Sequence, residues 1–267
     1  MDFITAALYG VIQGFSEFLP VSSSGHLAIL PHFIKMKDPG IAFDLAMHAG
    51  TALAVIIYYR KQITGIILEV PTVVLQKKYK NETYLLVNMS IATLITMIFG
   101  LIFKDLAAEY GRSAHMIAYN LIGFGLLMGL SDRNIKMNEG ELTQRPAYVK
   151  AALIGLFQVM AIFPGVSRSG ATLTMSRFFG ISRTEATSFS FLLSLPVIAG
   201  GILLKLPELL NGEGFELSTL FFGIFISFIV GLGTIHFFLK FISRFGLWSF
   251  VCYRVLAGIV LLFILEN

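Results

Sequence analysis

Six long runs of apolar residues limit the folds that this sequence can adopt. They cover residues 41–60, 84–103, 114–131, 185–206, 217–240 and 248–265. A helix needs about 20 residues to cross a hydrocarbon core ~30 Å thick, so each run is long enough to span a membrane. The chain is 56% hydrophobic and only 13% charged, which is too little charge to cover a soluble protein of 267 residues. The sequence therefore predicts an all-α polytopic membrane protein with about six transmembrane helices.

Other features of the composition exclude several classes of function. Cys252 is the single cysteine, so a disulfide framework and a thiolate metal site are both excluded. The net charge of +4 is explained by cytoplasmic loops, and the absence of a basic patch interleaved with aromatic residues argues against nucleic-acid binding. The chain starts with an acid at Asp2 instead of a basic region, so we expect the first apolar segment to be retained and not removed as a signal peptide.

Two pairs of shorter apolar segments are each interrupted by a polar break: 2–19 with 26–35, and 147–163 with 171–180. The breaks read FLPVSSSGH at 18–26 and PGVSRSGAT at 164–172. The second segment of each pair is too short to cross, so each pair is predicted to form a re-entrant hairpin. Irregular polar backbone is tolerated at membrane depth only where protein or a water-filled cavity covers it. Both breaks should therefore line a cavity.

The two breaks belong to an internal repeat. GVIQGFSEFLPVSSSG (10–25) aligns without gaps to GLFQVMAIFPGVSRSG (155–170), with identities that include Gly10/Gly155, Gln13/Gln158, Phe18/Phe163, Ser22/Ser167, Ser24/Ser169 and Gly25/Gly170. An odd number of predicted crossings, 41–60, 84–103 and 114–131, separates the copies, so the second copy should be inverted. We expect one membrane domain, 1–267, made of inverted repeats 1–133 and 145–267 joined by a loop at 134–144.

The positive charges orient this arrangement in a plasma membrane. Loops on one predicted side carry most of the lysine and arginine residues, among them Arg60, Lys61, Arg133, Arg145 and Lys150. Cytoplasmic loops of membrane proteins are enriched in these residues. The other side, with both termini and the mouth of the first hairpin, is therefore expected to face outside.

The first hairpin carries groups suited to acid–base and nucleophilic chemistry. Gln13 and Glu17 share one helix face because they are four residues apart. The break that follows presents a candidate nucleophilic serine and an imidazole within Ser22, Ser23, Ser24 and His26. On the next apolar segment, Asp44 and His48 are also four residues apart. They could support this site or form a local polar pair at the interface, and the sequence does not decide between the two.

The second hairpin carries groups suited to binding an anion. Arg168 lies in a membrane segment, where an unpaired arginine costs about 2.5–3.5 kcal/mol or more and usually marks a functional site. Its planar fork suits a phosphate. Ser167, Ser169 and Thr172 add hydroxyl groups beside the start of a helix, where exposed N–H groups attract anions. Serine-rich breaks can also serve only for close packing, but two copies with different charged residues favour a phosphate-ester site.

These motifs closely resemble those of the undecaprenyl-diphosphatase family, the bacitracin-resistance type of membrane phosphatase. The similarity covers essentially the whole chain and rests on Gln13 with Glu17, on FLPVSSSGH and on PGVSRSGAT. The resemblance implies removal of the terminal phosphate from a C55 polyprenyl diphosphate, which releases the monophosphate lipid carrier for cell-wall precursor synthesis. It also implies dependence on Mg²⁺ or Ca²⁺ and a site reached from the outer leaflet.

The resemblance also assigns roles to individual residues. By this resemblance, Ser23 is the candidate nucleophile, His26 the acid/base, and Glu17 an acidic partner or metal ligand. Substrate binding falls to the residues Arg168, Ser167, Ser169, Thr172, Ser22, Ser24 and Gln13. Gln13 stands where Glu often occurs, which weakens a metal role for this position, and Ser24 stands where Thr also occurs.

Several alternatives remain open at this stage. His26 could attack phosphorus directly while the serines only bind substrate. Inverted repeats with broken helices are also typical of secondary transporters, so the protein could flip the polyprenyl-phosphate lipid between leaflets. A pure transporter needs anion-binding groups but no nucleophile, and the combination of Ser23, His26 and Glu17 favours an enzyme. Assembly as a homodimer is a further open alternative.

Overall fold

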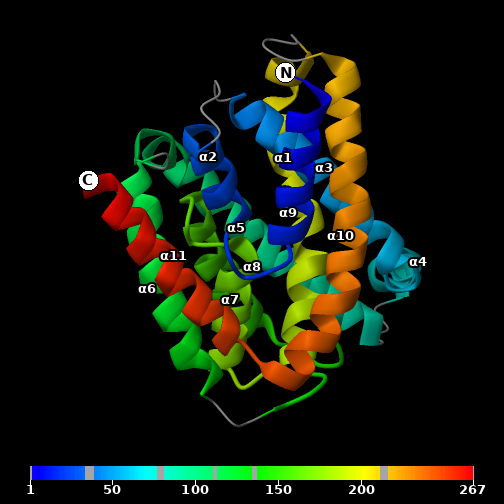
Figure 1. Ribbon diagram of the computed structural model, residues 1–267. Coiled ribbons are helices and arrows are strands. Elements are labelled where there is room, and N and C mark those ends of the chain that lie inside the picture. Colours follow the sequence, from blue (N-terminus) through cyan, green and yellow to red (C-terminus); the bar gives the residue numbers. More distant parts are fainter. Residues whose placement is uncertain are drawn as a thin grey trace.

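The computed structural model describes residues 2–33, 39–76, 81–110, 113–133, 137–210 and 216–266 (Figure 1). Its helices are α1 (Phe3–Ser16), α2 (Ser23–Phe33), α3 (Ile41–Tyr58), α4 (Arg60–Gln76), α5 (Asn81–Tyr110), α6 (Ala114–Asp132), α7 (Tyr148–Val159), the 3₁₀ turn η1 (Met160–Ile162), α8 (Arg168–Phe178), α9 (Arg183–Leu210), α10 (Leu217–Phe245) and α11 (Trp248–Glu266). Residues 134–136 of the predicted connecting loop and residues 34 and 35 of the first hairpin lie outside the described residues.

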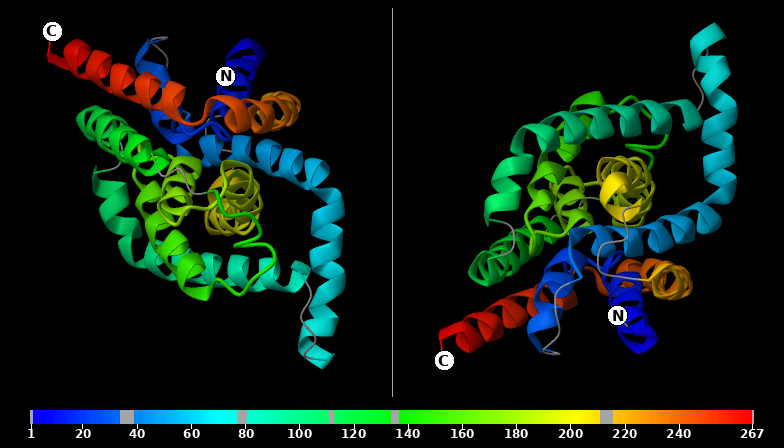
Figure 2. Two further views of the ribbon diagram at one scale, coloured as in Figure 1. Left: turned by 90° about the horizontal axis from the view of Figure 1, so that it is seen from below. Right: turned by 90° about the horizontal axis from the view of Figure 1, so that it is seen from above.

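Each of the six apolar runs predicted to cross the membrane lies mainly within one of these helices, which confirms the all-α membrane class. In the described part of the chain, α5, α6, α9, α10 and α11 are long and apolar enough to span a membrane alone. The run at 41–60 forms α3, which passes the same test only together with α4, and the two are bent by 81° at their junction. Figure 2 shows α4 along its length in the views that show α9 and α10 end-on, so α4 lies across the direction of these two helices.

The first helix of each polar break is too short to cross a membrane. Helix α1 has 14 residues and α7 has 12, so α1 is about 21 Å long against a hydrocarbon core of ~30 Å. Pro20 follows the end of α1, and Pro164 follows η1, where the missing N–H and the fixed ring oppose further helix. In Figure 1, α1 and α7 enter from opposite ends of the molecule and end near its middle.

Glycines let both short helices lie directly against long spans. A Cβ on Gly10 of α1 would come 2.5 Å from the carbonyl oxygen of Gly223 in α10, and a Cβ on Gly155 of α7 would come 2.4 Å from that of Ala92 in α5. Each short helix therefore packs on a span from the other half of the chain. The division into inverted repeats 1–133 and 145–267 stays a prediction, which this matched packing supports.

The end of the molecule away from the N-terminus is fastened by a buried ionic cluster. Asp132, at the end of α6, accepts hydrogen bonds from Arg177 Nε at 3.0 Å and from Arg183 Nε at 2.9 Å. Its second oxygen accepts from the backbone N–H of Leu247 at 3.1 Å. The cluster joins α6, α8, α9 and the turn before α11 and lies apart from the hairpin tips.

Candidate active site at the hairpin tips

Both hairpin tips turn through a serine with the same unusual backbone. The φ angle is 75° at Ser22 and 73° at Ser167, in the left-handed region that side chains other than glycine rarely adopt. Ser22 Oγ accepts the N–H of Gly25 at 3.2 Å, and Ser167 Oγ accepts that of Gly170 at 3.1 Å. Each serine thus caps the helix that follows it, α2 or α8.

The two tips are also bonded to each other. Ser22 Oγ accepts the N–H of Gly165 at 2.9 Å, and Ser169 Oγ donates to the carbonyl of Leu19 at 3.1 Å. The Oγ atoms of Ser22 and Ser24 lie 3.4 Å apart, and those of Ser167 and Ser169 lie 3.2 Å apart. Serines that were predicted to bind substrate are therefore bonded to backbone and to one another, and their contact with substrate stays a prediction.

Arg254 on α11 donates hydrogen bonds to both hairpin loops. Its guanidinium is fully buried and donates to the carbonyls of Pro20 at 3.0 Å, Val166 at 2.9 Å and Gly165 at 2.7 Å. It also donates to the carbonyls of Asn120 and Leu121 in α6. Arg254 therefore satisfies loop carbonyls at membrane depth, where water cannot do so.

Glu17 is the point at which chemistry-bearing residues of both hairpins meet. It follows α1 directly, and its Oε2 accepts a hydrogen bond from Ser23 Oγ, at the start of α2, at 2.7 Å. Its Oε1 accepts from Arg168 Nη2, at the start of α8, at 2.9 Å. Gln13 Nε2 donates to Oε2 from one turn back on α1 at 3.1 Å. The structure therefore brings Gln13, Glu17, Ser23 and Arg168 together.

A second imidazole reaches the same carboxylate. His48 Nε2 lies 3.3 Å from Glu17 Oε2, and His48 Nδ1 lies 2.8 Å from the backbone carbonyl of Asp44. A carbonyl only accepts, so Nδ1 donates to it, and Nε2 donates to the Glu17 carboxylate when the ring is an imidazolium with a proton on both nitrogens. His48 therefore contacts the site, whereas Asp44 contributes its backbone carbonyl. This contact favours the first of the two readings left open by the sequence, and the supporting role stays a prediction.

Arg168 is bonded on two sides, and its Nε donates to no group among the described residues. Besides its bond to Glu17, Nη1 donates to the carbonyl of Ser190 on α9 at 2.7 Å. Its buried Nε has no hydrogen-bond partner among the described residues. Ser190 Oγ lies 2.6 Å from Thr172 Oγ1, so Thr172 faces α9. The role of Ser190 could not be predicted, since this residue lies in an ordinary apolar span. Because this N–H of a cationic group is free to donate and Glu17 already accepts from Nη2, the arrangement favours an anionic ligand at Nε.

His26 has different neighbours. Its Nδ1 lies 2.7 Å from the carbonyl of Ser22, and its Nε2 contacts the hydroxyl of Tyr253 on α11. The rings of His26 and Tyr253 are stacked with centroids 5.8 Å apart. No hydrogen bond joins His26 to Ser23 among the described atoms of the two residues. The role of His26 as acid/base stays a prediction, and Tyr253 is a neighbour that the sequence did not indicate.

The chain was also compared with models of known protein families. The family model described as bacitracin resistance protein BacA matches residues 6–260. The match includes both hairpin tips, the Glu17 cluster and the described spans from α5 to α10, together with α11 as far as residue 260. The chain therefore belongs to the BacA family of bacitracin resistance proteins, whose members are undecaprenyl-diphosphatases.

Proposed function

We propose that this protein hydrolyses undecaprenyl diphosphate by phosphoryl transfer through Ser23. Membership of the family implies the phosphatase activity itself. The observation that supports the mechanism is the 2.7 Å hydrogen bond from Ser23 Oγ to Glu17 Oε2. A serine hydroxyl is a weak nucleophile unless an adjacent base accepts its proton, and Glu17 is placed to do so.

In the first step, Ser23 Oγ bonds to the terminal phosphorus and its proton passes to Glu17. The bond from that phosphorus to the bridging oxygen breaks, and undecaprenyl monophosphate leaves. Water then attacks the phosphoserine, releases inorganic phosphate and restores the Ser23 hydroxyl. In this step we assign general acid–base assistance to His26, through a movement that frees its Nε2 from Tyr253.

Arg168 stabilises the charge that develops during the transfer. Its Nε is buried and without a partner among the described residues, while Nη1 and Nη2 are fixed by Ser190 and Glu17. A guanidinium fixed in this way offers a preorganised donor to a phosphoryl oxygen. The neighbouring Ser167, Ser169 and Thr172 complete the proposed phosphate-binding surface at the start of α8.

The family resemblance implies Mg²⁺ or Ca²⁺, and the oxygen atoms beside Ser23 fit a hard cation. Gln13 Oε1 is buried and has no hydrogen-bond partner among the described residues, and Glu17 supplies a carboxylate one turn away. The described residues contain no group of three or more His, Cys, Asp or Glu placed to hold a metal. Glu17 and Gln13 are the residues that would hold the ion, and the ion would neutralise diphosphate charge.

The activity is tested with purified protein in liposomes that contain undecaprenyl diphosphate. We expect release of inorganic phosphate from the wild type and a loss of at least about 100-fold in Glu17→Gln, which cannot accept the proton. Movement of a labelled lipid between leaflets, measured on the same liposomes, tests the transporter alternative. Leaflet exchange without phosphate release would reject hydrolysis as the function.

A further inference from the structure

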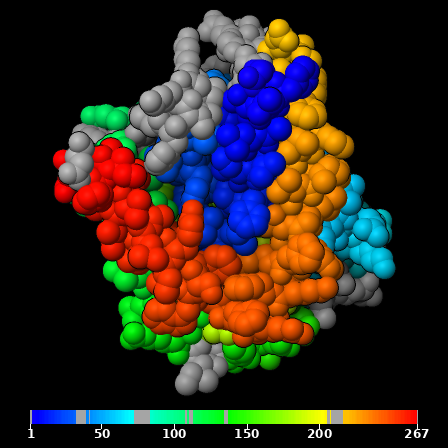
Figure 3. All heavy atoms as spheres, viewed as in Figure 1, coloured from blue at the N-terminus to red at the C-terminus, as the bar shows by residue number. Residues whose placement is uncertain are grey.

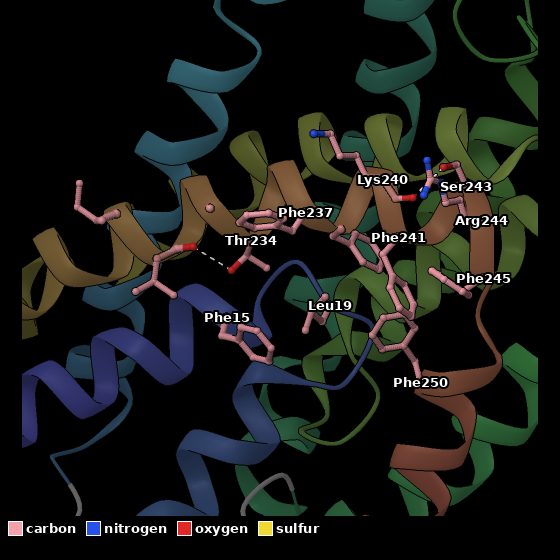
Figure 4. A pocket seen from close by; sticks show the side chains of 14 residues that line it. Phe15, Leu19, Thr234, Phe237, Lys240, Phe241, Ser243, Arg244, Phe245 and Phe250 are labelled. Atoms are coloured by element: carbon pink, nitrogen blue, oxygen red, sulfur yellow. Dashed lines mark hydrogen bonds between the residues drawn. The ribbon is translucent and has the colours of Figure 1, made fainter.

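A large apolar groove lies beside the first hairpin tip, on the surface that faces lipid. Its volume is about 940 Å³, and its walls come from the end of α1, the first hairpin loop, α10 and the start of α11. Figure 4 shows Phe15, Leu19, Phe241 and Phe250 around one space beneath α10, while the amine of Lys240 points to the other side of that helix. The exposed fraction is 57% for Phe15 and 71% for Phe237. The groove therefore suits an apolar occupant.

The groove exists because α1 ends before α10 does. The two helices run side by side with Gly10 on Gly223 and Gly14 on Ser227. Helix α1 then ends at Ser16, whereas α10 continues to Phe245. Figure 3 shows α10 and the start of α11 continuing below the end of α1 on this face. The part of α10 that α1 leaves uncovered lines the groove over a length of about 24 Å, from Ile229 to Phe245.

The end of the groove at the first hairpin tip lies next to the candidate active site. Leu19 lines the groove, lies two residues after Glu17 and accepts a hydrogen bond on its carbonyl from Ser169 Oγ at 3.1 Å. The mouth of the first hairpin faces the end of the molecule that carries the N-terminus, and the part of α10 that lines the groove runs toward the opposite end (Figure 1). A lipid with its head group at the tip would thus have its chain along the groove, pointing away from the mouth of the hairpin. The chains of lipids in the leaflet on the mouth side point in the same direction.

We propose that this groove binds the isoprenoid chain of the diphosphate substrate. The inference rests on the proposed function and adds the place where the chain is held. A long chain buries apolar area on aromatic walls in proportion to its length, so the groove favours long substrates over short ones. The diphosphate contacts the hairpin tips whatever the chain length. Binding in the groove should therefore affect long substrates and leave short ones unchanged.

Gly233 on α10 offers a direct way to fill the groove. It is one of the lining residues, and a Cβ built on it meets no atom within 4 Å. A phenylalanine at this position would occupy the groove without first displacing its neighbours. Gly123 on α6 also has no atom within 4 Å of a built Cβ and does not line the groove. Gly123→Phe is therefore a matched control for the cost of phenylalanine on a span.

The experiment measures kcat/KM of wild type, Gly233→Phe and Gly123→Phe on a C55 polyprenyl diphosphate and on a C5 prenyl diphosphate, which has a single isoprene and so makes little use of the groove. We expect Gly233→Phe to lose about tenfold on the C55 substrate, mostly through KM, because about two buried CH₂ equivalents give a tenfold change. Its activity on the C5 substrate should stay within about twofold of wild type. Gly123→Phe should match wild type on both. Equal loss on both chain lengths, or no loss on C55, would overturn the proposal.

Binding is also measured without turnover, so that the two proposals can fail separately. A C55 diphosphate with a photoreactive group on the third isoprene from the diphosphate should crosslink to residues 229–250 in wild type and in Gly123→Phe, and much less in Gly233→Phe. Crosslinking elsewhere in all three proteins contradicts the groove even if phosphate is released. Crosslinking in the groove without phosphate release from either substrate would instead reject the proposed hydrolysis and keep the binding site.

Discussion

At the scale of single residues, Glu17 connects the parts of the site. Its two oxygens accept hydrogen bonds from Ser23, Gln13 and Arg168, and His48 lies beside them. The sequence motifs predicted Glu17, Ser23 and Arg168 as site residues, and the structure brings these three together. His48 and Ser190 could not be assigned from sequence, because their roles depend on how α3 and α9 pack against the tips.

Arg168→Lys tests whether the guanidinium geometry matters beyond its charge. An ammonium cannot reach Glu17 and the Ser190 carbonyl while presenting a third donor to phosphate, so we expect kcat/KM to fall by at least about 100-fold. The protein should still insert and keep its melting temperature within a few degrees. Phosphate release near the wild-type rate in this variant would rule out the proposed role of Arg168.

His48 is expected to act by holding Glu17 in position. His48→Ala should lower kcat by about 10- to 100-fold with little change in KM, since the ring contacts the base and not the lipid. His48→Gln can place an N–H donor near the same oxygen and should restore most of the rate. If His48→Gln is as slow as His48→Ala, or if KM alone changes, His48 does not position the carboxylate through its donor.

At the scale of elements, the two broken helices depend on contacts that local sequence does not reveal. The breaks at 18–26 and 164–172 were predictable, because serine, glycine and proline interrupt apolar runs there. The use of Ser22 and Ser167 as helix caps with positive φ was not, because left-handed serines are rare. The loop carbonyls that Arg254 satisfies are likewise known only from the structure.

Arg254→Leu should weaken both hairpins at once. It leaves the carbonyls of Pro20, Gly165 and Val166 without their buried donor, and each unsatisfied group costs about 1–3 kcal/mol. We expect at least about 3 kcal/mol of destabilisation, seen as a lower melting temperature in detergent, together with loss of activity. Cys252→Ala, an exposed position on the same helix, is the control and should melt like wild type. Unchanged melting of Arg254→Leu would show that the loops hold without it.

At the scale of the whole molecule, the six apolar runs were enough to predict the helical membrane class, and the two polar breaks predicted which helices stop midway. Helices α1 and α7 differ from the spans in being too short to cross. The 81° bend between α3 and α4 depends on packing that the apolar pattern does not encode. The groove was not predictable either, since it arises where α1 ends against α10. The orientation rests on the charges, and we propose that the mouth of the first hairpin opens outside.

Cysteine labelling tests that orientation in a Cys252→Ala background. Asn138 lies at the end with the ionic cluster, and Ser218 lies at the start of α10, at the end with the N-terminus; both are exposed. We expect Ser218→Cys to react with a membrane-impermeant thiol reagent in intact cells, and Asn138→Cys only after the cells are opened. The reverse pattern would place the mouth of the first hairpin in the cytoplasm.

The most direct test of the whole account is to look for phosphate on Ser23 during turnover. Wild-type protein mixed with undecaprenyl diphosphate, quenched in acid and digested, should show phosphoserine at Ser23 by mass spectrometry. Ser23→Ala should release phosphate only at the background rate, yet still bind the diphosphate through Arg168. Phosphate found on His26, or robust hydrolysis by Ser23→Ala, would contradict the mechanism.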